Sequence, residues 1–372
     1  MVLLLLHSCR VFNWQRQSRI LGHVKLPTRS CSSKTAWPDR ILSGIQPTGV
    51  LHIGNYFGAV KNWVDLQNSN HDVLCAIVDL HSMTLPYDPQ KLPQHILLMA
   101  ASLISCGIDP EKSILFLQSE VPQHTQLCWI LSTCTTLRRL AQLPQYSEKS
   151  EYLEKPLLGL LWYPVLQAAD ILVYKATRIP VGKDQVQHLQ LANALVRTFN
   201  LKYGETFPHS KPIFNPNNAA RIRSLIDPTK KMSKSFPDPN SRIDITDPPD
   251  LIASKLKLAN LESTLSIVYD PQTRPGVSNL IEMHSALTGR QISEVCQEFK
   301  DFDIERYRET VTEVMVETLR PIQSEVDRLL NNKEYIISAL KKGTQKATDI
   351  AADTWRSVTE KTGNHLIKYE KK

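Results

Sequence analysis

The sequence contains neither paired cysteines nor a long apolar run. Its 372 residues include seven cysteines, and no two of them form a Cys-x-x-Cys pair. This spacing excludes the common zinc-binding and disulfide-framework patterns and is typical of a chain whose thiols stay reduced. No apolar run approaches the roughly 20 residues that a membrane-spanning helix needs. We therefore expect a globular protein with no membrane association, and the length suggests about two domains.

Acidic residues are missing from the first 38 positions, which contain six arginines and lysines. Since the whole chain has a net charge of +7, this segment carries +6 and leaves +1 for all the other residues. The nearly neutral body gives no argument for nucleic-acid binding from charge alone. An acid-free N-terminus with arginines and serines is typical of a mitochondrial transit peptide. We therefore predict a transit peptide at residues 1–36, cleavage before Trp37 and a location in the mitochondrial matrix.

Two other interpretations of this N-terminus were weighed. A secretory signal would need an apolar core of about 7–15 residues, and the run at residues 2–6 is too short for that. A tail without any targeting role could have the same composition.

Short apolar runs alternate with helical stretches between residues 37 and 246. Strands are expected at residues 40–42, 73–78 and 113–117, and helices at 56–66, 95–105, 125–132 and 184–199. Such alternation is typical of an α/β fold with a parallel sheet. Ligands of such sheets bind at the carboxyl ends of the strands. The segments 43–55, 79–81 and 182–185 lie at such ends, so we expect them to converge on one crevice.

The pattern changes in the second half of the chain. The runs at residues 170–174 and 178–181 are expected to frame a turn, and the Pro- and Asn-rich segment 207–218 is expected to be a loop. From residue 247 onwards the apolar residues keep helical spacing. We therefore predict two domains, an α/β domain at 37–246 and an all-helical domain at 247–372.

A glycine-rich turn at residues 43–59 connects the first expected strand to the first expected helix. Gly44, Gly49 and Gly54 allow the backbone to approach a ligand closely. A strand-to-helix turn also directs N–H groups and the positive end of the helix dipole towards an anion. An ordinary βα turn would share these features. The tetrapeptide His52-Ile53-Gly54-Asn55 adds two neutral hydrogen-bonding side chains, which favours a phosphate site.

A run of lysines and hydroxyl residues, Lys230-Lys231-Met232-Ser233-Lys234-Ser235, lies in the proline-containing segment 227–249. Most such runs are solvated surface charges. This one lies between the two expected domains, where a mobile lysine loop can fold onto a polyphosphate and stabilise developing charge. The run alone does not decide between the two interpretations.

Taken together, these motifs resemble those of class I aminoacyl-tRNA synthetases. His52-Ile53-Gly54-Asn55 is similar to the "HIGH" motif of that class, and residues 231–235 match its KMSKS motif letter for letter. Four further segments resemble the tryptophanyl-tRNA synthetases in particular: residues 44–49, 181–185, 227–230 and 317–322. The resemblance runs from about residue 39 to near the carboxyl end. With the N-terminal segment, the chain looks like the mitochondrial form of this family.

The resemblance implies a Rossmann-like catalytic domain, a helical tRNA-binding domain that includes the anticodon-binding surface, and a homodimer. It also implies that tryptophan and ATP, with Mg²⁺, form tryptophanyl-adenylate and pyrophosphate, and that the tryptophanyl group then passes to tRNA(Trp). In-line attack on the α-phosphorus needs positioning and charge stabilisation rather than a protein nucleophile. This accounts for the absence of a Ser/His/Asp or Cys/His arrangement. No metal ligand from the protein is implied.

For ATP, the resemblance implies residues of both motifs and of the loops between them. The catalytic set is His52, Asn55, Lys231 and Lys234. The ATP-binding set is Gln46, Pro47, Thr48, His52, Ile53, Gly54, Asn55, Lys149, Gly182, Lys183, Asp184, Ile222, Lys231, Met232, Ser233, Lys234 and Ser235. Within it, residues 182–184 would hold the ribose, and the backbone at Ile222 would lie by the adenine. Lys149 could equally be a plain surface charge.

For tryptophan, the resemblance implies an apolar pocket with a carboxylate that accepts the indole N–H. The implied set is Asp170, Gln185, Tyr163, His81, Gln46, Gly44, Val78 and Val181. A lone Asp170 could also simply make a local hydrogen bond, and a lone His81 could be a structural histidine. If Asp170 is the acceptor, ligands without that donor are rejected because a buried acceptor would stay unpaired.

Two glutamines favour different amino-acid substrates. Gln167 stands where bacterial tryptophanyl enzymes usually have Met and tyrosyl enzymes commonly have Gln. Gln46 and the segment 181–185 favour tryptophan instead, and this longer match weighs more. A tyrosyl-tRNA synthetase, a small-metabolite nucleotidyltransferase and a tRNA-binding protein without catalysis remain as alternatives.

The helical tail has a modest positive charge. Residues 332–372 contain nine Lys or Arg and five Asp or Glu, a net charge of +4. A solvated helix face would have a similar composition. By resemblance we expect phosphate contacts to tRNA there, with base stacking on exposed aromatic side chains.

Overall fold

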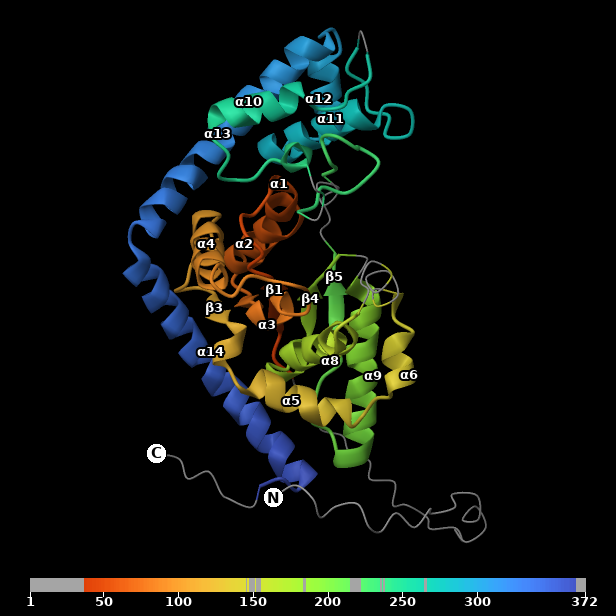
Figure 1. Cartoon of the computed structure of the whole chain (residues 1–372), viewed down its shortest axis with the longest axis vertical. Coiled ribbons are helices and arrows are strands. Elements are labelled where there is room, and N and C mark those ends of the chain that lie inside the picture. Colours follow the sequence, from red (N-terminus) through yellow and green to blue (C-terminus); the bar gives the residue numbers. More distant parts are fainter. Residues whose placement is uncertain are drawn as a thin grey trace. The chain divides into compact units, whose positions relative to one another are not determined.

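The computed structural model describes residues 37–365, with gaps at 145, 147–150, 152–154, 183–184, 215–221, 235, 237 and 264–265. The described residues from Trp37 onwards form one compact unit. Its centre is a five-stranded sheet of β1 (Arg40–Ile45), β2 (Asp72–Ile77), β3 (Ile114–Leu117), β4 (Arg178–Pro180) and β5 (Lys211–Ile213). All strands are parallel, and their order is β3-β2-β1-β4-β5 (Figure 1). The predicted Rossmann-like fold is confirmed.

The helices of the α/β part lie on both faces of the sheet. They are α1 (Ile53–Asn55), α2 (Lys61–Asn68), α3 (Asp79–Ser82), α4 (Leu92–Ser105), α5 (Gln123–Ser132), α6 (Leu137–Ala141), α8 (Leu158–Val173) and α9 (Val186–Tyr203). A π-helical turn at Tyr56–Val60 joins α1 to α2. The second helical group is α10 (Pro249–Lys257), α11 (Pro275–Thr288), α12 (Ile292–Phe299), α13 (Ile304–Leu330) and α14 (Lys333–Thr362). The predicted helical character of the tail is confirmed.

Successive residues of the central strands supply two separate cores. Ile41, Val73 and Cys75 pack into a cluster with α4 and the C-terminal helices, whereas Leu42 and Leu74 pack into a cluster with α5, α8 and α9. Side chains of a strand alternate between its two faces, and both faces here are covered by helices. This is why the strands appear in the sequence as continuous apolar runs.

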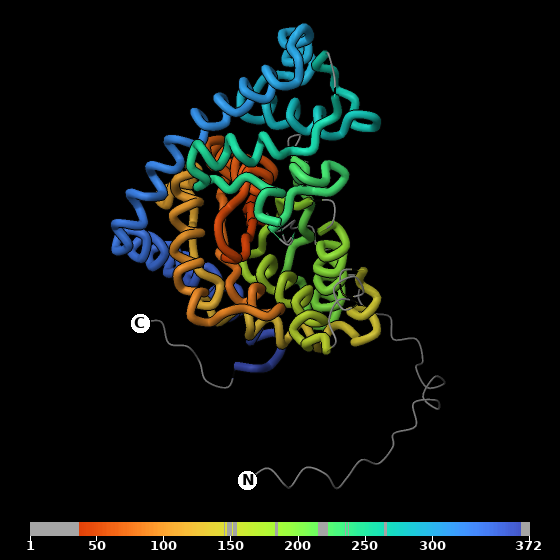
Figure 2. Tube along the Cα trace, turned by 45° about the horizontal axis from the view of Figure 1, so that its top comes forward, coloured from red at the N-terminus to blue at the C-terminus, as the bar shows by residue number. Residues whose placement is uncertain are grey.

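The helical tail covers the β3 edge of the sheet. Figure 2 shows α14, in dark blue, running back along the α/β part. A Cβ atom on Gly343 of α14 would lie 1.8 Å from the Leu115 carbonyl oxygen of β3, so only glycine allows this approach. The Lys342 ammonium group pairs with Glu111 at 2.6 Å beside it. The helix thereby shields an edge strand from pairing with other chains. The domain boundary at residue 246 stays a prediction.

Two local expectations differ from the structure, and one is confirmed. The first helix starts at Ile53, three residues before the predicted start, because His52 caps it. The predicted turn between residues 170–174 and 178–181 is confirmed, because α8 ends at Val173, Lys175 has a positive φ of 51°, and β4 begins at Arg178. The segment predicted to be only loop contains the edge strand β5, where Pro212 is tolerated.

Candidate active site

Three loops leave the sheet at the same edge. The strands β1, β2 and β4 end at Ile45, Ile77 and Pro180, and the strand order reverses between β1 and β4. Parallel α/β sheets form their ligand crevice at such a switch point. The segments 43–55, 79–81 and 182–185 therefore start from one edge, as the sequence predicted.

His52 caps the helix that follows the glycine-rich turn. The Asn55 N–H donates to His52 Nδ1 at 3.2 Å, and the His52 N–H donates to Asn55 Oδ1 at 3.4 Å, which makes a capping box. Burial, and then the charges of Lys234, Arg242 and Lys231, lower the pKa of His52 to about 3. The ring is therefore neutral at pH 7, and since Nδ1 accepts a hydrogen bond, the proton is on Nε2. This Nε2–H can donate to a phosphate oxygen, and so can the Asn55 amide.

The lysine loop contacts the glycine-rich turn. Lys234 Nζ donates to the Gly49 carbonyl at 3.1 Å, although the two residues are 185 positions apart. The Met232 N–H donates to the Ile222 carbonyl at 3.1 Å and anchors the loop. Burial lowers the pKa of Lys234 to about 8, while Asp244 opposes the shift. The ammonium group therefore stays mostly protonated at pH 7, directly beside the turn.

Three residues of the predicted ATP-binding set belong to the hydrophobic core. Ile53 is 0 % exposed, and Ile222 and Met232 are each 1 % exposed, within the core cluster below the crevice. Any contact of these three with ATP must come from the backbone, because their side chains anchor the two motifs to the core. Gly54 lies where the two motifs pack together. A Cβ there would lie 3.0 Å from the His52 ring and 3.5 Å from Met232 Cβ.

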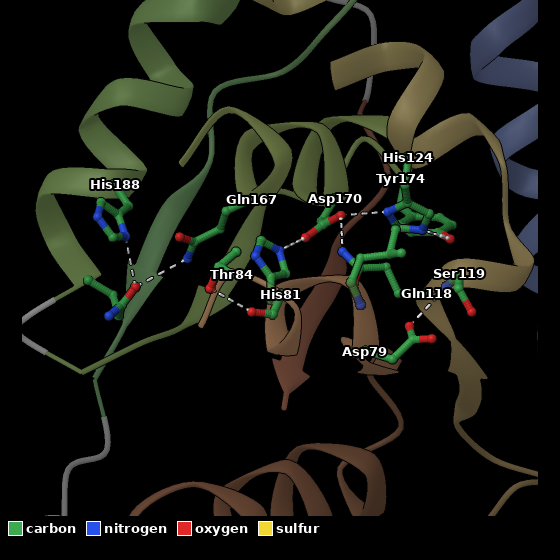
Figure 3. A network of polar contacts seen from close by, with 12 residues as sticks. Asp79, His81, Thr84, Gln118, Ser119, His124, Gln167, Asp170, Tyr174 and His188 are labelled. Carbon is green, nitrogen blue, oxygen red and sulfur yellow. Dashed lines mark hydrogen bonds and ion pairs between the residues drawn. The ribbon is translucent and has the colours of Figure 1, made fainter. Parts of the chain in front are cut away.

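Asp170 is the centre of a buried polar network (Figure 3). Its Oδ2 accepts from His81 Nε2 at 2.7 Å, and its Oδ1 accepts from His124 Nδ1 at 2.6 Å and from Gln118 Nε2 at 2.8 Å. Burial alone would raise the pKa of Asp170, but the charge of His81 and the hydrogen bonds of His124 and His81 outweigh it. The pKa of this carboxyl is therefore well below its usual range, and Asp170 is an acceptor at any working pH.

His124 connects Asp170 to a second buried group. Its Nε2 lies 2.8 Å from the Tyr174 hydroxyl, and burial, with the nearby Asp170 charge, raises the pKa of Tyr174. The phenol therefore stays protonated beside Nε2, and because the Asp170 carboxylate can only accept, Nδ1–H of His124 donates to it. The sequence analysis identified Asp170 and His81 but missed Gln118, His124 and Tyr174. They come from three elements, and no local pattern points to them.

A second polar chain runs from Gln167 of α8 to His188 of α9 (Figure 3). Gln185 Oε1 accepts from Gln167 Nε2 at 3.3 Å and lies 3.0 Å from His188 Nδ1. His188 Nε2 in turn lies 3.4 Å from the Tyr163 hydroxyl. Gln167 thus supports Gln185, which belongs to the predicted tryptophan-binding set. His188 was missed, because one histidine in a helix of mixed composition gives no signal.

The remaining predicted residues differ in exposure or lie outside the described residues. Gln46, Thr48, Gly44, Gly182 and Lys231 are exposed, Val181 and Ser233 are half-buried, and Pro47 and Val78 are buried. A Cβ on Gly44 would lie 2.9 Å from Val78 Cγ1, so a larger residue at position 44 would collide with the Val78 side chain. The residues outside are Lys149, Lys183, Asp184 and Ser235. Their roles stay predictions.

Two kinds of feature are absent from the described residues. In that part of the chain, no group of three or more His, Cys, Asp or Glu side chains could hold a metal ion. Nor does any helix described there have the length and apolarity to cross a membrane.

Comparisons with known proteins agree with this geometry. Residues 35–320 match the family model "tRNA synthetases class I (W and Y)". The chain is 42 % identical over 325 residues to the tryptophan–tRNA ligase of Clostridium acetobutylicum, covering 87 % of this chain and 96 % of the relative. It is 40 % identical to that of Bacillus anthracis, covering 87 % and 97 %.

Solved structures give the same answer. The tryptophanyl-tRNA synthetase of Campylobacter jejuni, solved with ADP and tryptophan, is similar with a TM-score of 0.76 and 32 % identity, covering 87 % of this chain and 99 % of that one. The tyrosyl-tRNA synthetase of Aeropyrum pernix shares only the fold, at 20 % identity and a TM-score of 0.63.

The chain belongs to the class I tRNA synthetases that act on tryptophan or tyrosine. Within that class its relatives are tryptophan–tRNA ligases, and its function is that of a tryptophanyl-tRNA synthetase. The tyrosyl alternative, suggested by Gln167, is therefore wrong, and so are the non-ligase alternatives.

Proposed function

We propose that this chain activates tryptophan with ATP and transfers it to mitochondrial tRNA(Trp) in the mitochondrial matrix. The observation that carries the first step is the contact between Lys234 and Gly49, which brings the lysine loop to the turn capped by His52. The α-phosphorus would be attacked by the tryptophan carboxylate, with Asp170 as acceptor for the indole N–H. Neutral donors and lysines would then stabilise the leaving pyrophosphate.

Mg²⁺ is proposed to arrive with ATP as its counter-ion. Phosphate-bound Mg²⁺ keeps several waters and needs few protein ligands.

The organelle and the tRNA are tested together. We expect residues 1–36, fused to a fluorescent reporter, to direct it into mitochondria, where the segment is removed. Protein starting at Trp37 is expected to drive tryptophan-dependent ATP–pyrophosphate exchange and to charge mitochondrial tRNA(Trp) faster than cytosolic tRNA(Trp). A cytosolic reporter would contradict the location, and equal charging of both tRNAs would contradict the choice of tRNA. Exchange without any charging would limit the function to amino-acid activation.

The homodimer is proposed on the family resemblance and on an exposed apolar surface, defined here as Met83, Leu85, Trp129, Leu157 and Leu158. Leu158 is 63 % exposed and Trp129 is 64 % exposed. Trp129 of α5 packs beside Trp162 of α8, and Gly159 lies against Thr84, so α5, the start of α8 and residues 83–85 meet there. Large apolar side chains gathered on one surface suit a second copy of the chain.

We expect the double variant Trp129→Asp and Leu158→Asp to halve the mass in solution measured by light scattering. Charged side chains would make burial of this surface against a second copy unfavourable. Leu258→Asp is the matched control, because Leu258 at the end of α10 is 57 % exposed. This variant should leave the mass unchanged. A wild-type protein of single-chain mass would refute the dimer.

A further inference from the structure

The segment Arg242–Ile245 runs antiparallel beside the start of α1. The Ile53 N–H donates to the Ile243 carbonyl at 2.9 Å, and the Ile245 N–H donates to the Leu51 carbonyl at 2.8 Å. Between these bonds His52 and Asp244 lie directly opposite each other. Opposite residues of an antiparallel pair point their side chains to the same face. Asp244 therefore faces the same side as His52.

The burial pattern confirms this orientation. Leu51, Ile53, Ile243 and Ile245 are all 0 % exposed and point into the core. Since side chains alternate along an extended segment, Arg242 and Asp244 point the other way, towards the crevice. Arg242 Nε donates to Asp244 Oδ1 at 3.2 Å, and each side chain is 19 % exposed. Nothing in the sequence motifs singled out either residue.

The Arg242 charge acts on residues of the His52–Asn55 and KMSKS motifs. After burial, the charges that lower the pKa of His52 are those of Lys234, Arg242 and Lys231, in that order. Arg242 thus acts on His52 more strongly than Lys231 of the KMSKS motif. Burial lowers the pKa of Lys234, and Asp244 in turn opposes this shift. Its own pKa is raised by burial, against the effect of Arg242.

We propose that Arg242 binds the polyphosphate of ATP alongside the KMSKS lysines, and that Asp244 is its counter-ion before ATP binds. A guanidinium group matches phosphate oxygens in a bidentate manner. A triphosphate in the crevice displaces the carboxylate as the partner of Arg242, and the carboxylate then repels pyrophosphate and favours its release. This inference rests on the proposed use of ATP by this site.

The test compares binding constants for ATP, pyrophosphate and tryptophan. We expect Arg242→Gln to raise KM for ATP and the inhibition constant of pyrophosphate about ten- to hundredfold, the range for a charged hydrogen bond, with KM for tryptophan unchanged. Arg242→Lys keeps the charge and should raise both only several-fold. Asp244→Asn should act in the opposite direction and lower the inhibition constant of pyrophosphate.

Arg40→Gln is the matched control. Arg40 Nε donates to Asp72 at 2.7 Å with a similar exposure of 17 %, but the pair lies at the opposite end of β1. KM for ATP should not change in this variant. An active Arg242→Gln or Arg242→Lys enzyme with unchanged constants for ATP and pyrophosphate overturns the role of Arg242. Tighter pyrophosphate binding in wild type than in Asp244→Asn overturns the counter-ion role.

Failure of the proposed function and failure of the Arg242 role give different results. If wild-type protein shows no tryptophan-dependent exchange, the proposed function fails. Calorimetric binding of pyrophosphate to wild type and Arg242→Lys still tests Arg242 in that case, and equal affinities refute its role. Thermal unfolding of each variant separates lost binding from lost folding.

Discussion

Replacing Lys234 by alanine is expected to slow tryptophanyl-adenylate formation by about 2–4 kcal/mol of barrier, or roughly 30- to 800-fold. Its ammonium group reaches the glycine-rich turn at Gly49, where it can meet the oxygens of the leaving pyrophosphate. Charge grows on these oxygens as the bond to the α-phosphorus breaks, so the loss falls mainly on the rate rather than on tryptophan binding. Single-turnover formation of adenylate at saturating tryptophan and ATP measures it.

Lys230→Ala is the control for this substitution. Lys230 belongs to the same lysine run, but it is 66 % exposed and pairs with Asp227 at 3.0 Å. Exposed pairs contribute little, so adenylate formation should stay within about twofold of wild type. Equal rates for Lys234→Ala and wild type would show that the Gly49 contact has no role in the chemistry.

The pH dependence gives a second readout of Lys234. Its pKa is lowered to about 8 by burial, so the group is charged below that pH and loses its proton as the pH rises through it. We therefore expect kcat/KM for ATP to fall above about pH 8 at saturating tryptophan. Lys234→Arg should move this fall to higher pH, because arginine stays protonated.

The sequence was a good guide where function depends on neighbours in the chain. The turn at residues 43–59 and the KMSKS run could each be recognised from a short stretch of sequence. A helix cap, a glycine and a lysine act there on residues only a few positions away. The buried strands could also be predicted, since a strand covered on both faces appears as a continuous apolar run. Strand β5 could not, because a short edge strand with Pro212 at its centre resembles a loop.

The parts that escaped prediction depend on contacts between distant segments. His124 and Asp170 are 46 positions apart, and Gln118 and Asp170 are 52 apart. Only the packing of α5, and of the turn that precedes it, against α8 reveals their hydrogen bonds. The orientation of Arg242 likewise follows from its pairing with the start of α1. For Gln167 the residue type alone suggested the wrong amino acid. Its contact with Gln185 shows a supporting role that does not require tyrosine.

The second large effect is expected for Asp170→Asn. The carboxylate accepts three hydrogen bonds, from His81, His124 and Gln118, and an amide can accept them only through its one oxygen. Removing one partner of a buried, charge-assisted network leaves donors unpaired, which costs about 3–5 kcal/mol. Urea unfolding should therefore show a lower free energy of unfolding. Tyr174→Phe removes only the last member of the chain and should cost about 1 kcal/mol.

A purely structural role of Asp170 would lower stability without changing the choice of amino acid, so selectivity is the decisive measurement. If Asp170 also accepts the indole N–H, wild type should strongly prefer tryptophan over its N1-methyl or sulfur analogue, which lack that donor. Asp170→Asn should lose most of this preference in exchange assays, because its amide can present a hydrogen to the ring instead of an acceptor. Tyr174→Phe keeps the carboxylate and should keep the preference. Equal preference in wild type and Asp170→Asn would assign Asp170 to folding alone and leave the selection of the indole to the apolar walls around it.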